Sequence, residues 1–356
     1  MAGTEPQRPA QGRFLSHSVV LAGLGAIGMG YDLECPVDQV RTHARALSSH
    51  PAFGLLIGVD PDRKRRSLFG TTYAGECYES LAPALTAHQP DLVVIATPTD
   101  DHAATLREVL ERSRPRAVLC EKPLAYDLDS ARSMVESCTE QGVALYVNYM
   151  RRADPAVAAV KRMLERDAIL RPVKGVVWYS KGLIHNGSHF IDLMRFWLGE
   201  PCAASLLSRG RRWEDRDPEP DFMLEFGQSS ICFLAAREEC FSHYTVELVA
   251  QNGRLRYERG GERVEWQGIA DDAQFPGYRV LQEPPQLLPA DMLRSQMNVT
   301  AQLANALAGL TTTLCTGPEG LETLGDITGV AQLAVDAQSA KERRRLTPQV
   351  ASRDPA

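Results

Sequence analysis

The first 150 residues of the chain contain five short, unbroken apolar runs, and these runs constrain the fold more than any other feature of the sequence. Unbroken hydrophobicity, in place of alternation, is typical of strands that are buried on both faces. The segments between the runs, such as residues 102–112 and 128–140, carry apolar residues at helical spacing. Strands and helices in this succession predict a doubly wound parallel sheet. The five predicted strands are residues 18–22, 55–59, 92–96, 117–120 and 144–147.

A glycine-rich turn follows the first predicted strand. Residues 23–28 read Gly-Leu-Gly-Ala-Ile-Gly, the spacing G-x-G-x-x-G. In this pattern the first glycine allows a tight turn, the second lets a pyrophosphate approach the backbone, and the third lets a helix pack closely on the strand. The pattern alone is weak, but its place after the opening strand favours a dinucleotide-binding Rossmann domain over an ordinary turn. The predicted cofactor contacts in this turn are Gly23, Gly25, Ala26, Ile27 and Gly28.

Asp60 ends the second predicted strand, where a carboxylate can bind both ribose hydroxyls and repel a 2′-phosphate. This position favours NAD as the cofactor. Asp60 follows Gly23 by 37 residues, against a usual interval of about 20, so residues 31–49 are expected to extend the first crossover. Four consecutive basic residues at 63–66 leave NADP as the less favoured alternative, unless they form only a solvated helix face.

The composition excludes several other classes of protein. The 39 Lys and Arg residues against 45 Asp and Glu residues give a net charge of −6, which argues against a dedicated nucleic-acid binder. No run approaches the roughly 18 apolar residues of a membrane span. The eight cysteines form no C-x-x-C pair, and the histidines lack partners at ligand spacing, so neither disulfides nor a metal site are expected. A small-molecule ligand is therefore expected.

The second half of the chain predicts a different sheet. Its strands alternate between apolar and polar residues, and turn signals such as Asn252-Gly253 separate them. This pattern is typical of an open, mostly antiparallel sheet with one face packed on helices. Helices are expected at 291–307 and 318–344. The predicted strands are residues 173–181, 221–226, 230–235, 245–249 and 254–259.

A length of 356 residues favours two domains, which gives an α/β protein with an N-terminal Rossmann domain and a C-terminal α/β domain. Residues 1–16 have no apolar core segment, so no signal peptide is predicted and the protein is expected in the cytoplasm. The expected organisation is a disordered tail at 1–16, the Rossmann domain at 17–148, the second domain at 149–345 and a disordered tail at 346–356.

Four further segments resemble a known family. Residues 97–102 (Thr-Pro-Thr-Asp-Asp-His) follow the third strand, and residues 121–123 (Glu-Lys-Pro) follow the fourth. Together with residues 148–152 (Asn-Tyr-Met-Arg-Arg) and 187–192 (Gly-Ser-His-Phe-Ile-Asp), they resemble the Gfo/Idh/MocA oxidoreductases. Glucose–fructose oxidoreductase and inositol dehydrogenase belong to this family. The resemblance extends over about residues 17–345, and Glu-Lys-Pro is its most specific part.

The resemblance implies hydride transfer between NAD or NADP and a carbon bearing a hydroxyl or ketone. The substrate class is a sugar, cyclitol or nucleotide-linked sugar. It also implies that the second domain binds the substrate and that another subunit, in a homodimer or homotetramer, covers its open sheet face. Ligands of such sheets bind at the carboxyl ends of the strands. The further cofactor contacts expected there are Thr97, Pro98, Thr99, His102, Glu121 and Lys122.

By position, Lys122 matches the family's conserved lysine and His189 its conserved histidine, which implies a catalytic pair. The apolar spacing of residues 190–197 predicts a helix with His189 in its first turn, where the macrodipole keeps the imidazole neutral and able to accept a proton. Lys122 precedes Pro123 in an expected cis peptide, and its ammonium can stabilise the reacting oxygen or join a proton relay. The alternatives are a buried histidine bonded to backbone and an ordinary surface lysine.

One position departs from the family. Many relatives carry an aspartate four residues before the conserved histidine, where this chain has His185. His185 cannot supply a fixed negative charge, so it is expected to bind substrate or share the relay. Asp192, in the helix interior, is expected to make a structural hydrogen bond. The basic run at 209–216 suggests contact with a nucleotide-sugar diphosphate, but a solvated loop is favoured there. The predicted substrate contacts are Lys122, Asn148, Arg152, His185, Asn186 and His189.

Two other functions remain open at this stage. Some relatives use NAD to open a transient keto-sugar intermediate for elimination or glycoside cleavage, and a few are ligand-sensing regulators without catalysis. The presence of both Lys122 and His189 favours an enzyme.

Overall fold

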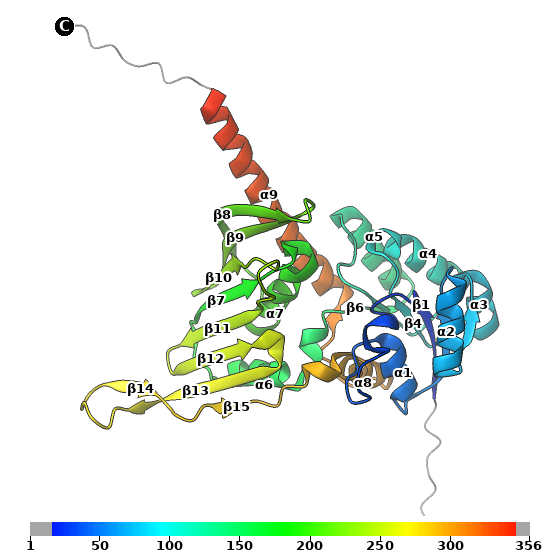
Figure 1. The fold of residues 1–356 in the computed structure, drawn as a ribbon, viewed down its shortest axis with the longest axis horizontal. Coiled ribbons are helices and arrows are strands. Elements are labelled where there is room, and N and C mark those ends of the chain that lie inside the picture. The colour runs from blue at the N-terminus through cyan, green and yellow to red at the C-terminus, as the bar shows by residue number, and fades with distance from the viewer. Residues whose placement is uncertain (1–15, 347–356) are drawn as a thin grey trace, which may run out of the picture.

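The computed structural model describes residues 16–346, and Figure 1 shows that they form two sheets, each with its own helices. The disordered tails predicted at the two ends lie outside the described residues. Within residues 16–346, no helix is long and apolar enough to cross a lipid bilayer.

The first sheet is doubly wound, as predicted. Its order is β16-β6-β5-β4-β1-β2-β3, and every neighbouring pair except β16–β6 is parallel. The strands are β1 (His17–Ala22), β2 (Phe53–Val59), β3 (Glu76–Tyr78), β4 (Leu92–Ile95), β5 (Ala117–Cys120), β6 (Ala144–Val147) and β16 (Cys315–Thr316). The helices of this half are α1 (His43–Ser49), α2 (Arg63–Tyr73), α3 (Leu81–His88), α4 (His102–Arg112) and α5 (Leu128–Glu140). The five predicted strands are confirmed; the short β3 and β16 escaped prediction because neither is long enough to show a pattern.

The first crossover contains the predicted extension, and its hydrogen bonds show how it is built. The amides of His43 and Ala44 donate to the carbonyls of Ile27 and Gly28 at 3.2 and 2.9 Å. In an uninterrupted α-helix, residues 31 and 32 would make these bonds. Residues 31–42 are therefore looped out of one helix, which resumes in register at α1.

Asp32 holds this looped-out segment together. It lies in the short helix η1 (Gly30–Asp32) and is fully buried. Its carboxylate accepts hydrogen bonds from the amides of Arg41 (2.8 Å) and Thr42 (2.9 Å) and from the Thr42 hydroxyl (2.8 Å). The segment is thus closed at its base by one buried carboxylate.

The second sheet is open and mostly antiparallel, as predicted, with order β14-β13-β12-β11-β7-β10-β9-β8 and β15 beside β13. Only its β7–β10 pair is parallel. Its core side is covered by α6 (Pro155–Glu165), α7 (Ser188–Leu198) and part of α9 (Gly317–Leu346). The strands are β7 (Lys174–Tyr179), β8 (Ala203–Trp213), β9 (Asp217–Phe226), β10 (Ser229–Ala235), β11 (Thr245–Ala250), β12 (Gly253–Glu258), β13 (Arg263–Asp271), β14 (Arg279–Leu281) and β15 (Gln286–Leu287).

The predicted helix over residues 190–197 is confirmed as α7, whose apolar side chains are buried in this core. The solvated loop predicted at 209–216 is wrong for most of its length, because residues 209–213 belong to β8 and pair with β9. Basic residues on an exposed edge strand look like a loop in the sequence, although they are a common protection of sheet edges.

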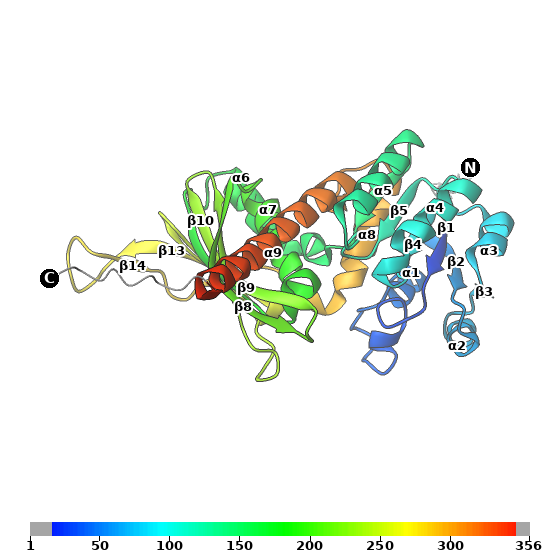
Figure 2. The same cartoon turned by 90° about the horizontal axis from the view of Figure 1, so that it is seen from above.

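The chain returns to the first domain near its end. Helix α8 (Ser295–Leu307) buries Val299 and Leu303 against β1 and β4, and β16 then pairs with β6. Figure 2 shows α9 running from there across to the second sheet. The boundary expected at residue 148 stays a prediction, and the first sheet includes a strand from beyond it.

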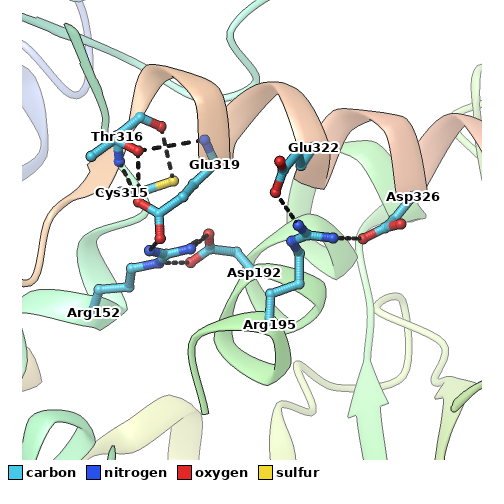
Figure 3. Close-up of polar contacts among 8 residues, drawn as sticks. All are labelled: Arg152, Asp192, Arg195, Cys315, Thr316, Glu319, Glu322 and Asp326. Carbon is cyan, nitrogen blue, oxygen red and sulfur yellow. Dashed lines mark hydrogen bonds and ion pairs between the residues drawn. The ribbon is translucent and has the colours of Figure 1, made fainter. Parts of the chain in front are cut away.

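Two arginines bind α9 to the second domain (Figure 3). Arg152 donates to Asp192 of α7 from Nε and Nη2, one edge of its guanidinium, at 2.8–3.1 Å, and from Nη1 to Glu319 of α9 at 2.7 Å. Glu319 also accepts hydrogen bonds from the amide and hydroxyl of Thr316, both at 2.8 Å, in the manner of a helix capping box. Arg195 of α7 contacts Glu322 and Asp326, one turn further along α9.

We expect Arg152→Ala to lower the free energy of unfolding by about 3–5 kcal/mol, because it leaves the Asp192 carboxylate buried without its partner. The side chains of Arg152 and Asp192 are only 3% and 0% exposed. Urea unfolding measures the change. Arg195→Ala is the matched control: its partner Glu322 is 49% exposed, so we expect a loss of about 1 kcal/mol. Equal losses in the two variants would contradict this account.

Candidate functional site

A cavity of about 810 Å³ lies at the carboxyl ends of β4, β5 and β6. One wall comes from the first domain, through residues 97–99, 121–123 and Asn148. The other comes from the second domain, through residues 184–186, His189 and residues 213–217. Its volume is within the usual range of small-molecule and cofactor sites, about 300–1,000 Å³.

The glycine turn leads to this cavity, and the fold explains two of its three glycines. A Cβ atom on Gly23, whose φ is +101°, would lie 2.4 Å from the Ala96 carbonyl oxygen, and one on Gly28 would lie 2.1 Å from that of Gly23. A Cβ on Gly25 would meet only the Arg65 guanidinium, at 3.9 Å. The fold therefore has no need of a glycine at 25, whereas a pyrophosphate approaching the backbone does.

Asp60 braces the same turn. It is 3% exposed, and its two carboxylate oxygens accept hydrogen bonds from the amides of Leu24 and Asp62, both at 2.8 Å. The Arg65 guanidinium lies 3.4 Å from the Leu24-bound oxygen. Asp60 thus connects the end of β2 to the glycine turn, and its predicted contact with a ribose stays a prediction.

Glu121 is held in place from two directions at the end of β5. Its Oε1 atom accepts a hydrogen bond from Asn148 Nδ2 (2.6 Å) and lies 2.7 Å from His43 Nε2. Burial alone would raise the pKa of Glu121, but the bond to His43, the bond to Asn148 and the charge of Lys122 bring it below its ordinary value. Glu121 is therefore an ionised carboxylate. His43 reaches it because α1 resumes in register after the looped-out segment.

Lys122 follows, and the predicted cis peptide between it and Pro123 is confirmed. Its ammonium donates a hydrogen bond to the carbonyl of His185 across the cavity. Burial lowers the pKa of Lys122, as does the charge of Arg151, while Glu121 and Asp217 oppose this shift.

His189 lies in the first turn of α7, as predicted, and is 6% exposed. Its ring meets Tyr149 edge-on, with 5.8 Å between centroids. Burial holds the pKa of His189 well below its ordinary value, with smaller effects from Lys122, Arg151 and His185. The predicted neutral imidazole agrees with this shift, although burial and not the helix dipole is its main cause.

His185 lies on the same wall, in the single π-helical turn η4 (Gly182–Gly187). Its ring packs against Trp213, with 5.4 Å between centroids and 34° between planes. Burial lowers the pKa of His185 to about 4, with help from the charges of Lys122 and Lys181. It is therefore neutral at physiological pH and cannot replace an anionic group. Asn186, also predicted to bind substrate, lines the cavity beside it.

Three buried polar atoms on residues of the cavity wall have no hydrogen-bond partner within the described chain: Thr97 Oγ1, Asn148 Oδ1 and His189 Nδ1. Buried polar atoms are almost always bonded, so these three call for a ligand or water. Together with the open space above Gly25, they fit a dinucleotide followed by a polar substrate. Among the described residues, no cluster of three or more side chains has the composition of a metal site.

Comparison with known proteins agrees with this geometry. Residues 19–149 match the model of the GFO_IDH_MocA family, described as an oxidoreductase family with an NAD-binding Rossmann fold. The first domain of this chain is thus similar to the NAD-binding domain of the Gfo/Idh/MocA oxidoreductases. It is therefore an NAD-binding Rossmann domain, as the sequence predicted.

Among curated relatives, the inositol 2-dehydrogenase of Mycolicibacterium smegmatis is 43% identical over 196 residues, covering 51% of this chain and 52% of that protein. The D-apiose dehydrogenase of Paraburkholderia graminis is 30% identical over 241 residues, covering 61% and 64%. The match thus spans about half to two thirds of these relatives. The activity of the whole chain is accordingly a matter for proposal.

Solved structures extend the likeness of the fold to the second domain. An oxidoreductase from Agrobacterium radiobacter, in complex with NAD+, L-tartaric acid and magnesium, superposes with a TM-score of 0.69 at 22% identity, covering 90% of this chain and 97% of that one. The WlbA dehydrogenase of Bordetella pertussis, in complex with NADH and UDP-GlcNAcA, superposes with a TM-score of 0.67 at 19% identity and the same coverage. The two-domain architecture of this chain is thus a known one.

One predicted substrate contact needs correction. Arg152 does not line the cavity: it is 2% exposed, and the Asp192 and Glu319 carboxylates occupy its guanidinium. The structural hydrogen bond expected of Asp192 is confirmed in the same pair. An arginine beside a predicted strand end looks available to a ligand, because the carboxylates that bind it lie 40 and 167 residues further along the chain.

His102 lines the cavity, but its ring nitrogens face backbone carbonyls, those of Thr97, Pro123 and Leu124, at 3.1–3.2 Å. It thus joins the loops after β4 and β5, which carry the other predicted cofactor contacts. Sequence reasoning missed several further wall residues, because no motif marks them. They are Tyr31, Tyr126, Asp217 and Gln296, whereas Trp213 and Arg216 of the cavity wall lie in the run at 209–216, for which the sequence favours a solvated loop over a ligand contact.

The glycine turn yields a direct test of cofactor binding. We expect Gly25→Ala to fold with unchanged stability, since its Cβ has open space, and to bind NAD about tenfold more weakly or worse because the methyl group obstructs the pyrophosphate. Gly28→Ala is the control, because its Cβ would overlap the Gly23 carbonyl and destabilise the turn itself. Isothermal titration with NAD and thermal unfolding separate the two effects. Unimpaired NAD binding by Gly25→Ala would show that the pyrophosphate does not approach the backbone at residue 25.

Proposed function

We propose that this protein is an NAD-dependent dehydrogenase or reductase acting on a secondary hydroxyl or ketone of a sugar, cyclitol or nucleotide-linked sugar. One observation carries the proposal: Lys122 and a neutral His189 line one cavity at the end of a dinucleotide-binding turn. The named relatives, inositol and apiose dehydrogenases, support the substrate class.

The residues of the cavity have separate tasks in this proposal. NAD, when bound, accepts or supplies the hydride. In the oxidative direction, neutral His189 takes the proton of the substrate hydroxyl. The Lys122 ammonium donates a hydrogen bond to the same oxygen and stabilises the negative charge that develops on it. His189 is buried, and the low dielectric around it strengthens its interaction with the substrate.

Further residues position the two ligands. Residues 23–28 and Asp60 hold the adenosine half of NAD, and residues 97–99, His102 and Glu121 frame the nicotinamide half. Asn148, His185 and Asn186 contact the substrate. The buried but unpaired Thr97 Oγ1 and Asn148 Oδ1 support these assignments, because each lacks a partner within the described protein.

We also propose that the protein assembles as a homodimer or homotetramer in the cytoplasm. The outward face of the second sheet exposes Trp178 (38%), Leu207 (54%) and Val249 (51%), a surface that another subunit would cover. All eight cysteines are free, as expected in a reducing compartment.

We predict that the protein binds NAD more tightly than NADP, because the buried Asp60 carboxylate repels a 2′-phosphate more strongly than the half-exposed Arg65 attracts it. Calorimetric titration with each cofactor measures the difference, and we expect at least tenfold. Tighter binding of NADP would show that Arg65 determines the cofactor.

The activity itself is tested by following NAD reduction over a panel of free sugars, cyclitols and nucleotide sugars. On the substrate so found, we expect Lys122→Ala and His189→Ala to lower kcat about a hundredfold or more, the usual scale for a positioned acid–base group, with NAD binding intact. Near-normal turnover in both variants would argue for a ligand sensor. Turnover of a glycoside without net NAD reduction would show instead the lyase or glycosidase chemistry.

The same assay run against pH checks the assigned protonation states. The pKa of His189 lies well below 6.5, so kcat/KM should not fall as the pH drops through 6.5. The pKa of Lys122 lies below 10.5, so the rate should fall on the alkaline side at a pH below 10.5, as the ammonium loses its proton. An acid limb centred near 6.5 would be inconsistent with His189 as the neutral base.

A further inference from the structure

We infer that Asp217 is a positioning residue of this active site: it holds the π-helical turn that carries His185 and acts through its charge on Lys122. The inference rests on the proposed function, because it assigns Asp217 a part in that reaction. No sequence motif marks this aspartate, which lies 95 residues after Lys122 and belongs to the other domain.

Asp217 lies at the start of β9 and lines the cavity, with an exposure of only 8%. Its two carboxylate oxygens face the turn η4. One accepts a hydrogen bond from the amide of Ile184 at 2.9 Å, and the other accepts one from the amide of His185 at 2.7 Å. The carboxylate thus binds two consecutive amides of the turn.

The turn needs such support. π-Helical turns are rare and occur mostly at functional sites. This one follows Lys181, a non-glycine residue at φ +63°, and begins at Gly182, at φ +78°. A Cβ on Gly182 would lie 2.2 Å from the Asp217 carboxyl group, and Glu219 accepts the Gly182 amide at 3.0 Å. Two carboxylates of β9 therefore hold the first amides of the turn, and Asp217 is the one that lines the cavity.

His185 connects Asp217 to Lys122. Its amide donates to the Asp217 carboxylate, and its carbonyl accepts from the Lys122 ammonium. A carboxylate from β9 and an ammonium from the end of β5 thus bind the backbone of a single residue. Loss of the Asp217 bond would free the carbonyl against which Lys122 is aligned.

The charges around Lys122 give Asp217 a second effect. Arg151 is a nearby cation, and His185 and His189 are neutral. Glu121 is already bound by His43 and Asn148. Asp217 is the carboxylate that acts on Lys122 from the second domain. Its charge raises the pKa of Lys122 and so opposes the lowering caused by burial. Glu219 is the acidic neighbour of Asp217 itself. In this arrangement Asp217 favours the protonated form of Lys122, which can donate to the reacting oxygen.

The test compares Asp217→Asn with Asp221→Asn. Asp221 is a matched control on the same strand: its carboxylate also accepts a backbone amide, that of Ala235 at 2.9 Å, but it does not line the cavity. Lysines of each protein are methylated reductively with [13C]formaldehyde, and the Lys122 signal is identified by its loss in Lys122→Arg. We expect the Lys122 midpoint to move to lower pH in Asp217→Asn and to stay unchanged in Asp221→Asn. A substitution that only disturbed the local fold would not shift the Lys122 midpoint consistently to lower pH.

Turnover supplies the second readout. We expect kcat of Asp217→Asn to fall about tenfold or more through misplacement of Lys122, with NAD affinity retained. If Asp217→Asn shows no cooperative thermal transition, Asp217→Ser replaces it, since serine removes the charge but can still accept one amide. An unchanged Lys122 titration, or an equal shift in Asp221→Asn, overturns the inference. The titration needs no substrate. If no compound of the substrate panel is turned over, the proposed function is refuted, but the titration still tests the effect of Asp217 on Lys122.

Discussion

The structure depends on one half-buried ammonium group at the junction of two domains. Lys122 lies at the end of a parallel strand, and its Nζ atom is bound by the carbonyl of His185 from the opposite domain. A buried ammonium is costly unless polar groups surround it. Here Glu121 supplies a carboxylate from the same loop and Asp217 one from β9. The bond between Lys122 and the His185 carbonyl thus joins the two domains at the cavity, and His189 lies on the wall of the same cavity.

Buried charges elsewhere in the chain fix loops in the same way. Asp60 binds the amide after the first glycine, Asp32 closes the looped-out segment, and Arg152 ties α7 to α9. The looped-out segment that Asp32 closes is itself connected to the active site. Residues 31–42 leave the helix and return without altering its register, so His43 still reaches Glu121, the neighbour of Lys122. An insertion that shifted the register would have removed a partner from the active-site carboxylate.

Local sequence predicted the parts of the site that follow strand ends. Gly23 and Gly28 are required by contacts within a few residues or by the adjoining loop, and Lys122 directly follows a strand whose apolar run is visible in the sequence. The family resemblance singled out His189, and the apolar periodicity of residues 190–197 placed it in the first turn of α7. Asp217 and Trp213 could not be found in this way, because they reach the cavity through the β8–β9 hairpin, whose approach is a property of tertiary packing. The prediction that Arg152 contacts the substrate was wrong for the same reason, because its partners Asp192 and Glu319 are distant in sequence.

The two walls of the cavity differ in how their residues are held, and this difference bears on specificity. The first-domain wall follows the ends of β4, β5 and β6, whose strands are buried and whose loops His102 joins. The second-domain wall consists of the π-helical turn and the hairpin around Trp213, which meet where the His185 ring packs on the indole. Hydride transfer needs the same nicotinamide geometry for every substrate, whereas the shape of the substrate differs. In the proposed function, the strand ends of the first domain would therefore serve the common chemistry, and the turn and hairpin would serve the choice of substrate. Asp217 connects the two walls. It begins β9 at the base of the hairpin, and it holds the turn whose His185 carbonyl binds Lys122 of the other wall.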